Sequence, residues 1–474
     1  MSLTFTDMYA GAGGSSTGLV NAGLELRLAA NHWQVAVDTH TANHPDAEHL
    51  CAEMEYYDMR RLPKTDILWA SPICTEISPA GGRPRIKGQL DDEEWKSLPD
   101  KAFQRTRATA FEVIRAVQLH RYKAVLVENV IEFATDWELF DWWLAGMAQL
   151  GYEYQIVCVS SAHIGDEFNL PAPQWRDRLY IVFTRIGVRL PDVKPTPLAF
   201  CEVCDEDVHA VQTWRKPRKP RKGQKPRRSG VGKYGVQYDY TCPCGHGVVE
   251  PYVQPASSII NWDDEGIRIA ERAEHGLEPL AESTIARIEA GLEMFPEDPS
   301  VLTLNHSGHD GRAFRPDTAP LPSRCAKIGE GLLLPPGVLP YATSSPDLAA
   351  PPFVIELRNH GKARKIDRPL SAVMAGGNHH GLVIPYRKGA KAKPTSEPLH
   401  TLSTHDSAGL LRQAARIEDC HFRMLKWREQ MNAQRFPPGY IVTGTSDAAK
   451  TVQAGNAVSC NVAQWLGERV AAVL

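Results

Sequence analysis

A cysteine and a glutamate each stand at the end of an apolar segment, where both could take part in covalent chemistry. Cys74 lies in Ser71-Pro-Ile-Cys-Thr, directly after the apolar run Asp66–Ala70, and Glu128 closes the run Val125-Leu-Val-Glu. A thiolate is the nucleophilic form of cysteine, and a desolvated carboxyl group gains proton affinity, which suits a general acid. The two residues are candidates for these roles. The alternatives are a thiol packed against a turn and a structural ion pair.

A glycine-rich turn and a pair of arginines add to this candidate site. The turn Asp7-Met-Tyr-Ala-Gly-Ala-Gly-Gly follows the first apolar run and opens a helical pattern. Its glycines let the backbone approach a ligand, and a helix N-terminus has free N–H groups, so a nucleotide-like cofactor is indicated, unless the turn only reverses the chain. Arg176 and Arg178 are two residues apart before an apolar run, so both point to one face of a strand. They either reach into one cleft or form surface ion pairs.

Strands that alternate with helices must position these residues. Residues 3–195 alternate short apolar runs with helix-like stretches, which predicts the α/β class with a doubly wound, mostly parallel sheet. The predicted strands are Leu3–Tyr9, Leu26–Ala30, Asp66–Ala70, Ala124–Glu128, Tyr154–Val159 and Leu179–Phe183. Crossover helices are predicted over Phe103–Leu119 and Trp137–Leu150, the latter with Trp142, Leu144 and Leu150 in the core. Closing helices are predicted over Glu418–Gln434 and Ala454–Val473.

Two cysteine pairs flank a basic run further along the chain. Cys201, Cys204, Cys242 and Cys244 form a C-x-x-C pair and a C-x-C pair, and four thiolates suit tetrahedral Zn²⁺. His209 or His246 could replace one of them. The run Trp214–Arg228 holds nine Lys or Arg in fifteen positions and is either a phosphate-contacting loop or a solubilising linker.

Composition limits the class of protein. The 474 residues are 43% hydrophobic and 23% charged with a net charge of −3, which indicates a folded globular protein that is not polybasic overall. We find no membrane-spanning run or signal-like start, and ten cysteines are too sparse for a disulfide framework, so a cytoplasmic protein with reduced thiols is expected. The expected units are the α/β domain 1–195, a zinc knuckle with its basic loop at 196–249, an irregular strand-rich insertion at 250–414 and closing helices at 415–474.

In order, these segments resemble the blocks of the cytosine-C5 DNA methyltransferase family, D-x-F-A-G-x-G-G, P-C-Q, E-N-V, Q-x-R-x-R and G-N-[AS]-V. The corresponding blocks here are Asp7–Gly14, Pro72–Thr75, Glu128–Val130, Gln174–Arg178 and Gly455–Val458. The resemblance implies the S-adenosylmethionine-dependent methyltransferase fold. It makes 1–195 the catalytic and cofactor-binding domain, completed by 415–474, and makes 250–414 the target-recognition domain.

The resemblance also implies methyl transfer from S-adenosylmethionine to C5 of cytosine in double-stranded DNA. Cys74 would bond to C6 of a flipped-out base, while Glu128 would hydrogen-bond N3 and the exocyclic amine. Arg178 would contact the O2 side of the base, with Arg176 supporting the site. The implied DNA contacts are Ser78, Arg83, Arg85, Lys87 and Gln174, and the basic run separately offers Arg215, Lys216, Arg218 and Lys219 as candidate phosphate contacts.

By the same resemblance, the glycine turn would hold the methionine part of the cofactor, Trp33 the adenine face and Asp58 with Met59 the adenine edge. His32 stands where the family has an acidic residue that holds the ribose hydroxyls. The full implied set is Asp7, Tyr9, Ala10, Gly11, Gly13, Gly14, His32, Trp33, Asp58, Met59, Pro72, Asn456, Ala457 and Val458.

Three alternatives keep some of these features. The same fold could act on RNA, it could use a modified sulfonium donor because of His32, or the chain could be a DNA-binding relative without catalysis. We expect a monomer without membrane association. A cognate restriction endonuclease would be a partner in a restriction-modification pair, and the sequence does not report one.

Overall fold

The structure is a computed structural model. It describes residues 2–73, 100–216, 228–294, 300–303, 313–317, 319–321, 330–334, 353–355, 363–365 and 416–474. Several predicted site residues lie outside the described residues, namely Cys74, Ser78, Arg83, Arg85, Lys87, Arg218 and Lys219.

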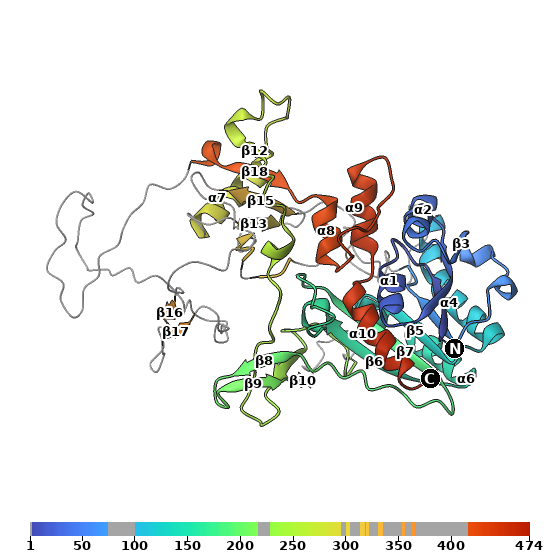
Figure 1. Cartoon of the computed structure of the whole chain (residues 1–474). Helices are drawn as coiled ribbons and strands as arrows, with labels where there is room; N and C mark the ends of the chain where they lie inside the picture. The colour runs from blue at the N-terminus through green and yellow to red at the C-terminus, as the bar shows by residue number, and fades with distance from the viewer. Residues whose placement is uncertain are drawn as a thin grey trace, which may run out of the picture.

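A seven-stranded sheet forms the centre of the α/β domain, in the order β3-β2-β1-β4-β5-β7-β6 (Figure 1). Its strands are β1 (Thr4–Met8), β2 (Glu25–Asn31), β3 (Glu48–Cys51), β4 (Ile67–Ala70), β5 (Ala124–Asn129), β6 (Tyr152–Ser160) and β7 (Asp177–Arg185). The pairs from β3 to β5 are parallel, whereas β7 is antiparallel to both β5 and β6. The mostly parallel sheet confirms the predicted class. The sequence did not predict β3, because this short edge strand has no apolar run.

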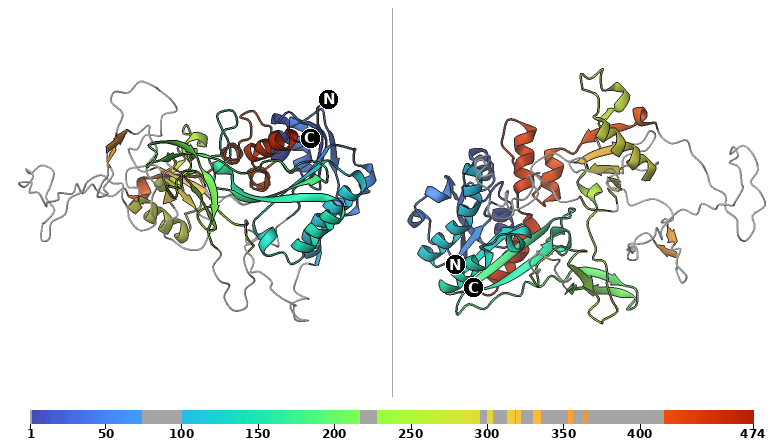
Figure 2. Two further views of the ribbon diagram at one scale, coloured as in Figure 1. Left: turned by 90° about the horizontal axis from the view of Figure 1, so that it is seen from below. Right: turned by 180° about the vertical axis from the view of Figure 1, so that it is seen from behind.

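Helices cover both faces of the sheet, which is why its central strands are apolar throughout. All residues of β4 and β5 are buried. Helices α1 (Gly14–Asn21) and α10 (Cys460–Ala471) pack on one face through Leu19, Val462 and Leu466. Helices α4 (Asp100–His120) and α6 (Phe140–Gln149) belong to the core of the other face, and Figure 2 shows the two groups on opposite sides. The C-terminal helix thereby completes the domain that the N-terminus begins.

The prediction that Trp142 lies in the core is wrong. Helix α6 buries Phe140, Trp143, Leu144 and Met147, which share one face at helical spacing. Trp142 falls outside this stripe and is 60% exposed.

A small module follows the sheet. It contains the antiparallel pairs β8 (Leu198–Cys201) with β9 (Glu206–His209) and β10 (Val211–Trp214) with β11 (Tyr238–Thr241). We call residues 196–252 the β8–β11 module. The basic run predicted from the sequence connects β10 to β11, and its positions 217–227 lie outside the described residues.

A second, five-stranded sheet lies beyond this module, in the order β12-β18-β15-β13-β14. Its elements are β12 (Ile267–Arg268), helix α7 (Glu282–Met294), β13 (Ser300–Thr303), β14 (Ala313–Phe314), β15 (Glu330–Leu334) and β18 (His421–Met424); a separate hairpin joins β16 (Phe353–Ile355) to β17 (Ala363–Lys365). β18 overturns the first part of the helix predicted over Glu418–Gln434, because Phe422 pairs with β12 and β15 and packs into the core of this sheet. Helix α8 (Trp427–Ala433) confirms the second part of that prediction, and helix α9 (Asp447–Asn456) follows it.

None of the helices in the described part of the chain has the length and hydropathy that a bilayer crossing needs.

Candidate active site

The residues predicted to form a site follow parallel strands at one edge of the large sheet. The glycine turn follows β1, Trp33 follows β2, Pro72 follows β4, and Glu128 lies at the end of β5. Because these four strands are parallel, their carboxyl ends meet at the same edge, which is where open α/β sheets bind ligands. The fold therefore brings the glycine turn, Trp33, Pro72 and Glu128 to one edge of the sheet.

The glycine turn has the backbone geometry that its composition predicts. Gly11 and Gly13 have φ values of 57° and 95°, and Tyr9 also lies in the left-handed region at 66°. A Cβ on Gly11 would have no atom within 4 Å, so this part of the turn faces open space. A Cβ on Gly14 would lie 2.0 Å from the carbonyl oxygen of Val458. Gly14 is thus needed for residues Gly455–Val458, here called the closing segment, to pack against the turn. Gly11 leaves room for a ligand.

Asp7 is buried and stabilises the glycine turn through hydrogen bonds to the start of α1. Its carboxylate is fully buried, and Oδ2 accepts hydrogen bonds of 2.6 Å from both Ser15 Oγ and Ser16 Oγ. Burial raises the pKa of Asp7 to about 7, against the two serine hydrogen bonds, which lower it. The side chain ties the end of β1 to the first turn of α1, so its support of a cofactor would be indirect.

A group of histidines behind the turn was not found from the sequence. His40 Nε2 lies 2.9 Å from Ser16 Oγ, and His40 Nδ1 lies 2.9 Å from His49 Nε2. His44 Nε2 lies 3.2 Å from Thr17 Oγ1, and burial lowers the pKa of His44 to about 4. Burial also lowers the pKa of His40. The available signal was the i, i+4 spacing of His40, on helix α2 (Gln34–Asn43), and His44, the residue that caps this helix.

Glu128 and Arg178 form an ion pair at the end of β5. Glu128 is 8% exposed, and its Oε1 lies 3.2 Å from Nε of Arg178 on the neighbouring strand β7. In the antiparallel register Glu128 faces Tyr180, two residues from Arg178, so both charged side chains stand on one side of the sheet. A carboxylate and a guanidinium therefore share this part of the site.

The residue after Glu128 holds the segment that leads to Cys74. Asn129 Nδ2 donates a 3.0 Å hydrogen bond to the carbonyl oxygen of Pro72, and the Ile73 N–H donates to Thr109 Oγ1 at 3.2 Å. Cys74 is the next residue after Ile73 and lies outside the described residues. The first hydrogen bond holds Pro72 at the end of β5, and the second holds Ile73 at helix α4.

Arg176 holds the closing segment instead of facing the ion pair. The guanidinium is 4% exposed and donates to the carbonyl oxygens of Ala457, at 2.7 Å, and Gly455, at 3.4 Å. Gln174, expected at the DNA, is fully buried, which leaves no surface for such a contact. In the closing block, Ala457 and Val458 are buried and Asn456 is exposed.

The remaining residues that were predicted to bind the cofactor differ in how much of each is exposed. Trp33 is half-buried at the start of α2, where its N–H donates to Asn31 Oδ1 at 2.9 Å, and His32 is exposed. Asp58 is paired with Arg60 at 2.8 Å, whose hydrogen bonds lower the pKa of Asp58 to about 2. The Met59 side chain lies in the core, so only its backbone could contact a ligand.

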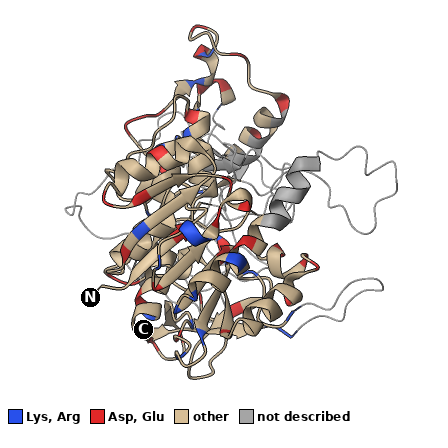
Figure 3. Ribbon diagram, turned by 90° about the vertical axis from the view of Figure 1, so that its right-hand side faces the viewer, with Lys and Arg blue, Asp and Glu red and all other residues tan. Residues whose placement is uncertain are grey.

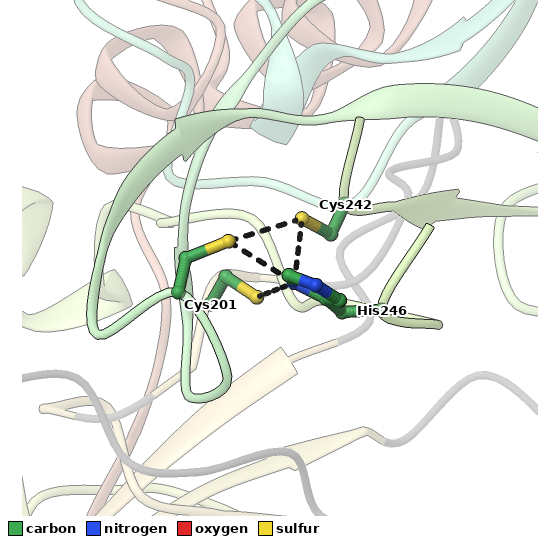
Figure 4. A group of neighbouring side chains, drawn as sticks. Cys201, Cys242 and His246 are labelled. Atoms are coloured by element: carbon green, nitrogen blue, oxygen red, sulfur yellow. Dashed lines mark hydrogen bonds between the residues drawn. The ribbon is translucent and has the colours of Figure 1, made fainter. Parts of the chain in front are cut away.

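Four potential metal ligands converge in the β8–β11 module. Cys201, Cys204, Cys242 and His246 each have a ligand atom within 4.8 Å of the others (Figure 4). Cys244, predicted as the fourth ligand, is exposed and is not in this group. His246, named above as an alternative ligand, completes the group.

Comparison with known proteins gives evidence on the family of this chain that does not depend on the geometry of the site. Residues 3–218 match the family model for C-5 cytosine-specific DNA methylases. The type II methyltransferase M1.HphI of Haemophilus parahaemolyticus is 26% identical over 224 residues, which are 44% of this chain and 53% of that protein. The type II methyltransferase M.HgiGI of Herpetosiphon aurantiacus is 34% identical over 88 residues, 18% of this chain and 70% of that protein.

The chain spans about half the length of M1.HphI, with 53% covered. Among solved structures, the Entamoeba histolytica methyltransferase EhMeth aligns over 99% of this chain and 98% of its own, with 10% identity and a TM-score of 0.47.

Proposed function

This chain belongs to the C-5 cytosine-specific DNA methylase family, and from that premise we propose that it transfers a methyl group from S-adenosylmethionine to C5 of cytosine in double-stranded DNA. One observation carries the proposal. Buried Glu128 at the end of β5 pairs with partly buried Arg178 on β7, and Asn129 ties the end of β5 to the segment that leads to Cys74. A nucleophile, an acid and a cation would then face one base.

Cytosine C6 accepts a nucleophile only when charge on the ring is neutralised. In the proposed reaction the Cys74 thiolate bonds to C6, and Glu128 shares a proton with N3 and accepts from the exocyclic amine. Arg178 orients the Glu128 carboxylate and donates to O2 of the base. The electron pair that reaches C5 would form the new bond to the methyl group, while the bond from that group to the cofactor sulfur breaks and the sulfur leaves as a neutral thioether. A base then removes the C5 proton, and the thiolate leaves as the C5–C6 double bond reforms.

Bound S-adenosylmethionine would supply an electrophilic methyl group on sulfur. The residues at the sheet edge fit such a group, because the turn at Gly11 faces open space and the aromatic ring of Trp33 is partly accessible at the end of β2. Asn456 is the exposed member of the closing block. These residues would hold the cofactor, and Arg176 would keep the closing segment in place.

The target atoms of cytosine are inaccessible inside a duplex. The base must therefore leave the stack, at a cost of about a few kcal/mol. Residues 74–99, which follow the end of β4 directly, include four of the predicted DNA contacts. We propose that they approach the DNA around the extruded base.

A mechanism-based substrate tests this function directly. A duplex with 5-fluorocytosine at the target position should give a denaturation-resistant adduct when S-adenosylmethionine is present, because fluorine at C5 cannot be removed as a proton. Cys74→Ser should abolish the adduct. Cys51→Ser is the matched control, since Cys51 is an exposed thiol at the end of β3.

Target sequences for this assay come from sequencing methylated cytosines in cells that express the chain. If adducts form with a fluorinated tRNA and none form with DNA, the substrate is RNA and the proposal of DNA as substrate is wrong. DNA binding without any adduct would contradict an enzymatic role.

A further inference from the structure

We propose that the Sγ atoms of Cys201, Cys204 and Cys242 and Nδ1 of His246 bind one Zn²⁺ ion, which locks the β8–β11 module in the form that docks on strands β6 and β7. The ligand set differs from the four cysteines that spacing alone suggests. It does not depend on the methyl-transfer chemistry.

Four of the six distances between the ligand atoms lie within about 0.4 Å of those expected for a tetrahedral zinc site, and all six are within 4.8 Å. Zn–S bonds of about 2.3 Å and Zn–N bonds of about 2.0 Å at tetrahedral angles place two sulfurs about 3.8 Å apart and a sulfur and a nitrogen about 3.5 Å apart. Cys204 Sγ and Cys242 Sγ are 3.7 Å apart. His246 Nδ1 lies 3.7 Å from Cys201 Sγ, 3.7 Å from Cys242 Sγ and 3.1 Å from Cys204 Sγ.

Hydrogen bonding alone does not explain this arrangement. A single imidazole nitrogen has either one hydrogen or one lone pair, so it cannot make three good hydrogen bonds to thiols at once. The Nδ1 atom of His246 nevertheless lies within 3.7 Å of three sulfurs. A central cation accounts for the convergence, because each atom then directs its lone pair to one point.

Two tight turns present the ligands. Cys201 ends β8, and the Asp205 N–H donates to its carbonyl oxygen at 2.9 Å, with Asp205 at φ 55°. Cys242 follows β11, and the Gly245 N–H donates to its carbonyl oxygen at 3.0 Å, with Gly245 at φ 80°. Each turn returns the chain so that a second ligand meets the first, which is how pairs of closely spaced ligands hold structural zinc.

The module has few apolar residues to hold it together. Its buried hydrophobic cluster consists of Ala199, Cys201, Val208, Ala210, Tyr238, Tyr240, Cys242 and Val249. Two of these are ligands, and two are alanines. A core of this size needs a further source of stability, such as a structural metal.

The module contacts β6 and β7, and β7 carries Arg178. Gln212 Nε2 donates to the carbonyl oxygen of Cys158 on β6 at 2.8 Å, and the Tyr234 N–H donates to Asp177 Oδ1 on β7 at 3.1 Å. The ring of His163, directly after β6, lies 4.4 Å from that of Tyr234 and 5.2 Å from that of Tyr240. Asp177 is adjacent to both Arg176 and Arg178, so an ordered module supports the strand beneath the candidate active site.

Metal content of the full chain, purified under reducing conditions without a polyhistidine tag, is the first test. We expect about one zinc per chain, as for a closed four-ligand site. Cys204→Ser and His246→Ala should each lose the metal. Cys244→Ser should keep it, although the Cys244 thiol interacts with that of Cys204. A metal-free wild-type chain overturns the inference, and so does a His246→Ala variant that keeps zinc while Cys244→Ser loses it.

Cobalt substitution checks the ligand set without a variant. The wild-type chain loaded with Co²⁺ should show tetrahedral d–d bands and thiolate-to-metal charge transfer, with an intensity that corresponds to three thiolates. An octahedral spectrum would overturn the proposed site.

Hydrogen exchange of the full chain before and after chelation tests the structural role. The amides of β10 and β11 should gain exchange on metal removal, while those of β1 and β4 stay protected. Unchanged exchange in β10 and β11 would overturn the locking role. Because neither measurement involves DNA or methyl transfer, their failure is distinct from a failure of the proposed function.

Discussion

At the scale of single residues, the two arginines of one motif have separate tasks. Arg178 pairs with Glu128, whereas Arg176 donates to backbone carbonyls of the closing segment. Their alternation predicts only that both point to the same face of β7. The two roles differ because Arg176 donates to the carbonyl oxygen of Ala457, which lies 281 residues away along the chain.

Replacement of Arg178 by alanine should lower kcat/KM for methyl transfer by about 10²–10³-fold, the usual effect of losing one preorganised donor. The reason is that Arg178 orients Glu128 and would donate to the base. Incorporation of labelled methyl groups into DNA measures the rate. Arg185→Ala is the control, because Arg185 ends the same strand and is exposed. Equal losses in both variants would argue against a role for the ion pair.

At the scale of elements, the closing segment and the glycine turn fit together backbone to backbone. Gly14 and Gly18 are the points of contact, since added Cβ atoms would lie 2.0 Å from the Val458 oxygen and 2.4 Å from the Cys460 oxygen. The sequence correctly indicated a glycine-rich turn after β1, and its role beside a cofactor stays a prediction. The sequence could not indicate which glycines pack against the last helix and which leave space beside the turn.

Alanine at positions 14 and 11 should therefore have different effects. Gly14→Ala should destabilise the protein by about 1–3 kcal/mol or more, because backbone atoms must move to admit the methyl group. Gly11→Ala should cost about 1 kcal/mol for its left-handed backbone and mainly weaken S-adenosylmethionine binding. Chemical unfolding and calorimetric titration measure the two effects. The assignment fails if Gly11→Ala is the less stable variant and binds the cofactor normally.

The contact between the β8–β11 module and the large sheet contains a buried histidine. His163 is 2% exposed among aromatic rings, and within the described residues neither of its ring nitrogens has a hydrogen-bond partner. Burial lowers the pKa of His163 from 6.5 to about 3. The unfolded chain thus takes up a proton below about pH 6.5 that the folded chain refuses until about pH 3, so acid weakens the fold in this interval.

His163→Phe should remove this pH dependence. Between pH 6.5 and 5, an interval of 1.5 pH units, the free energy of unfolding of the wild type should fall by about 2 kcal/mol more than that of the variant. Urea unfolding at several pH values measures the difference. His209→Phe replaces an exposed histidine of the same module and should leave the wild-type slope unchanged. Parallel slopes for His163→Phe and wild type would contradict the buried neutral state.

At the scale of the whole molecule, charge is balanced overall and concentrated locally. The net charge is −3, and acidic and basic residues are interspersed over the face in Figure 3. The run Trp214–Arg228 is the exception in the sequence. Its described ends are tied to the protein, because Arg215 pairs with Asp239 and Arg228 pairs with Asp141.

If this run contacts phosphates, its removal should change how DNA affinity depends on salt. Substituting Lys216, Lys219, Lys222 and Lys225 with glutamine should reduce the slope of log affinity against log salt by about one for each lost contact. Fluorescence anisotropy with a labelled duplex at several salt concentrations measures the slope. Arg27→Gln, which removes an exposed charge on β2, is the control. An unchanged slope would assign the run to a linker role.

The sequence by itself determined the central strands, the order of the motifs and their place at strand ends, because continuous apolar runs and glycine-rich turns are local signals. The reactive pair of Cys74 and Glu128 stays a prediction from the resemblance, because the cysteine lies outside the described residues. Tertiary structure alone decided the antiparallel insertion of β7, the burial of Gln174, the exposure of Trp142 and the entry of His246 into the cysteine cluster. Each depends on contacts between segments distant in the chain or on which side of an element faces the core, and neither follows from local composition.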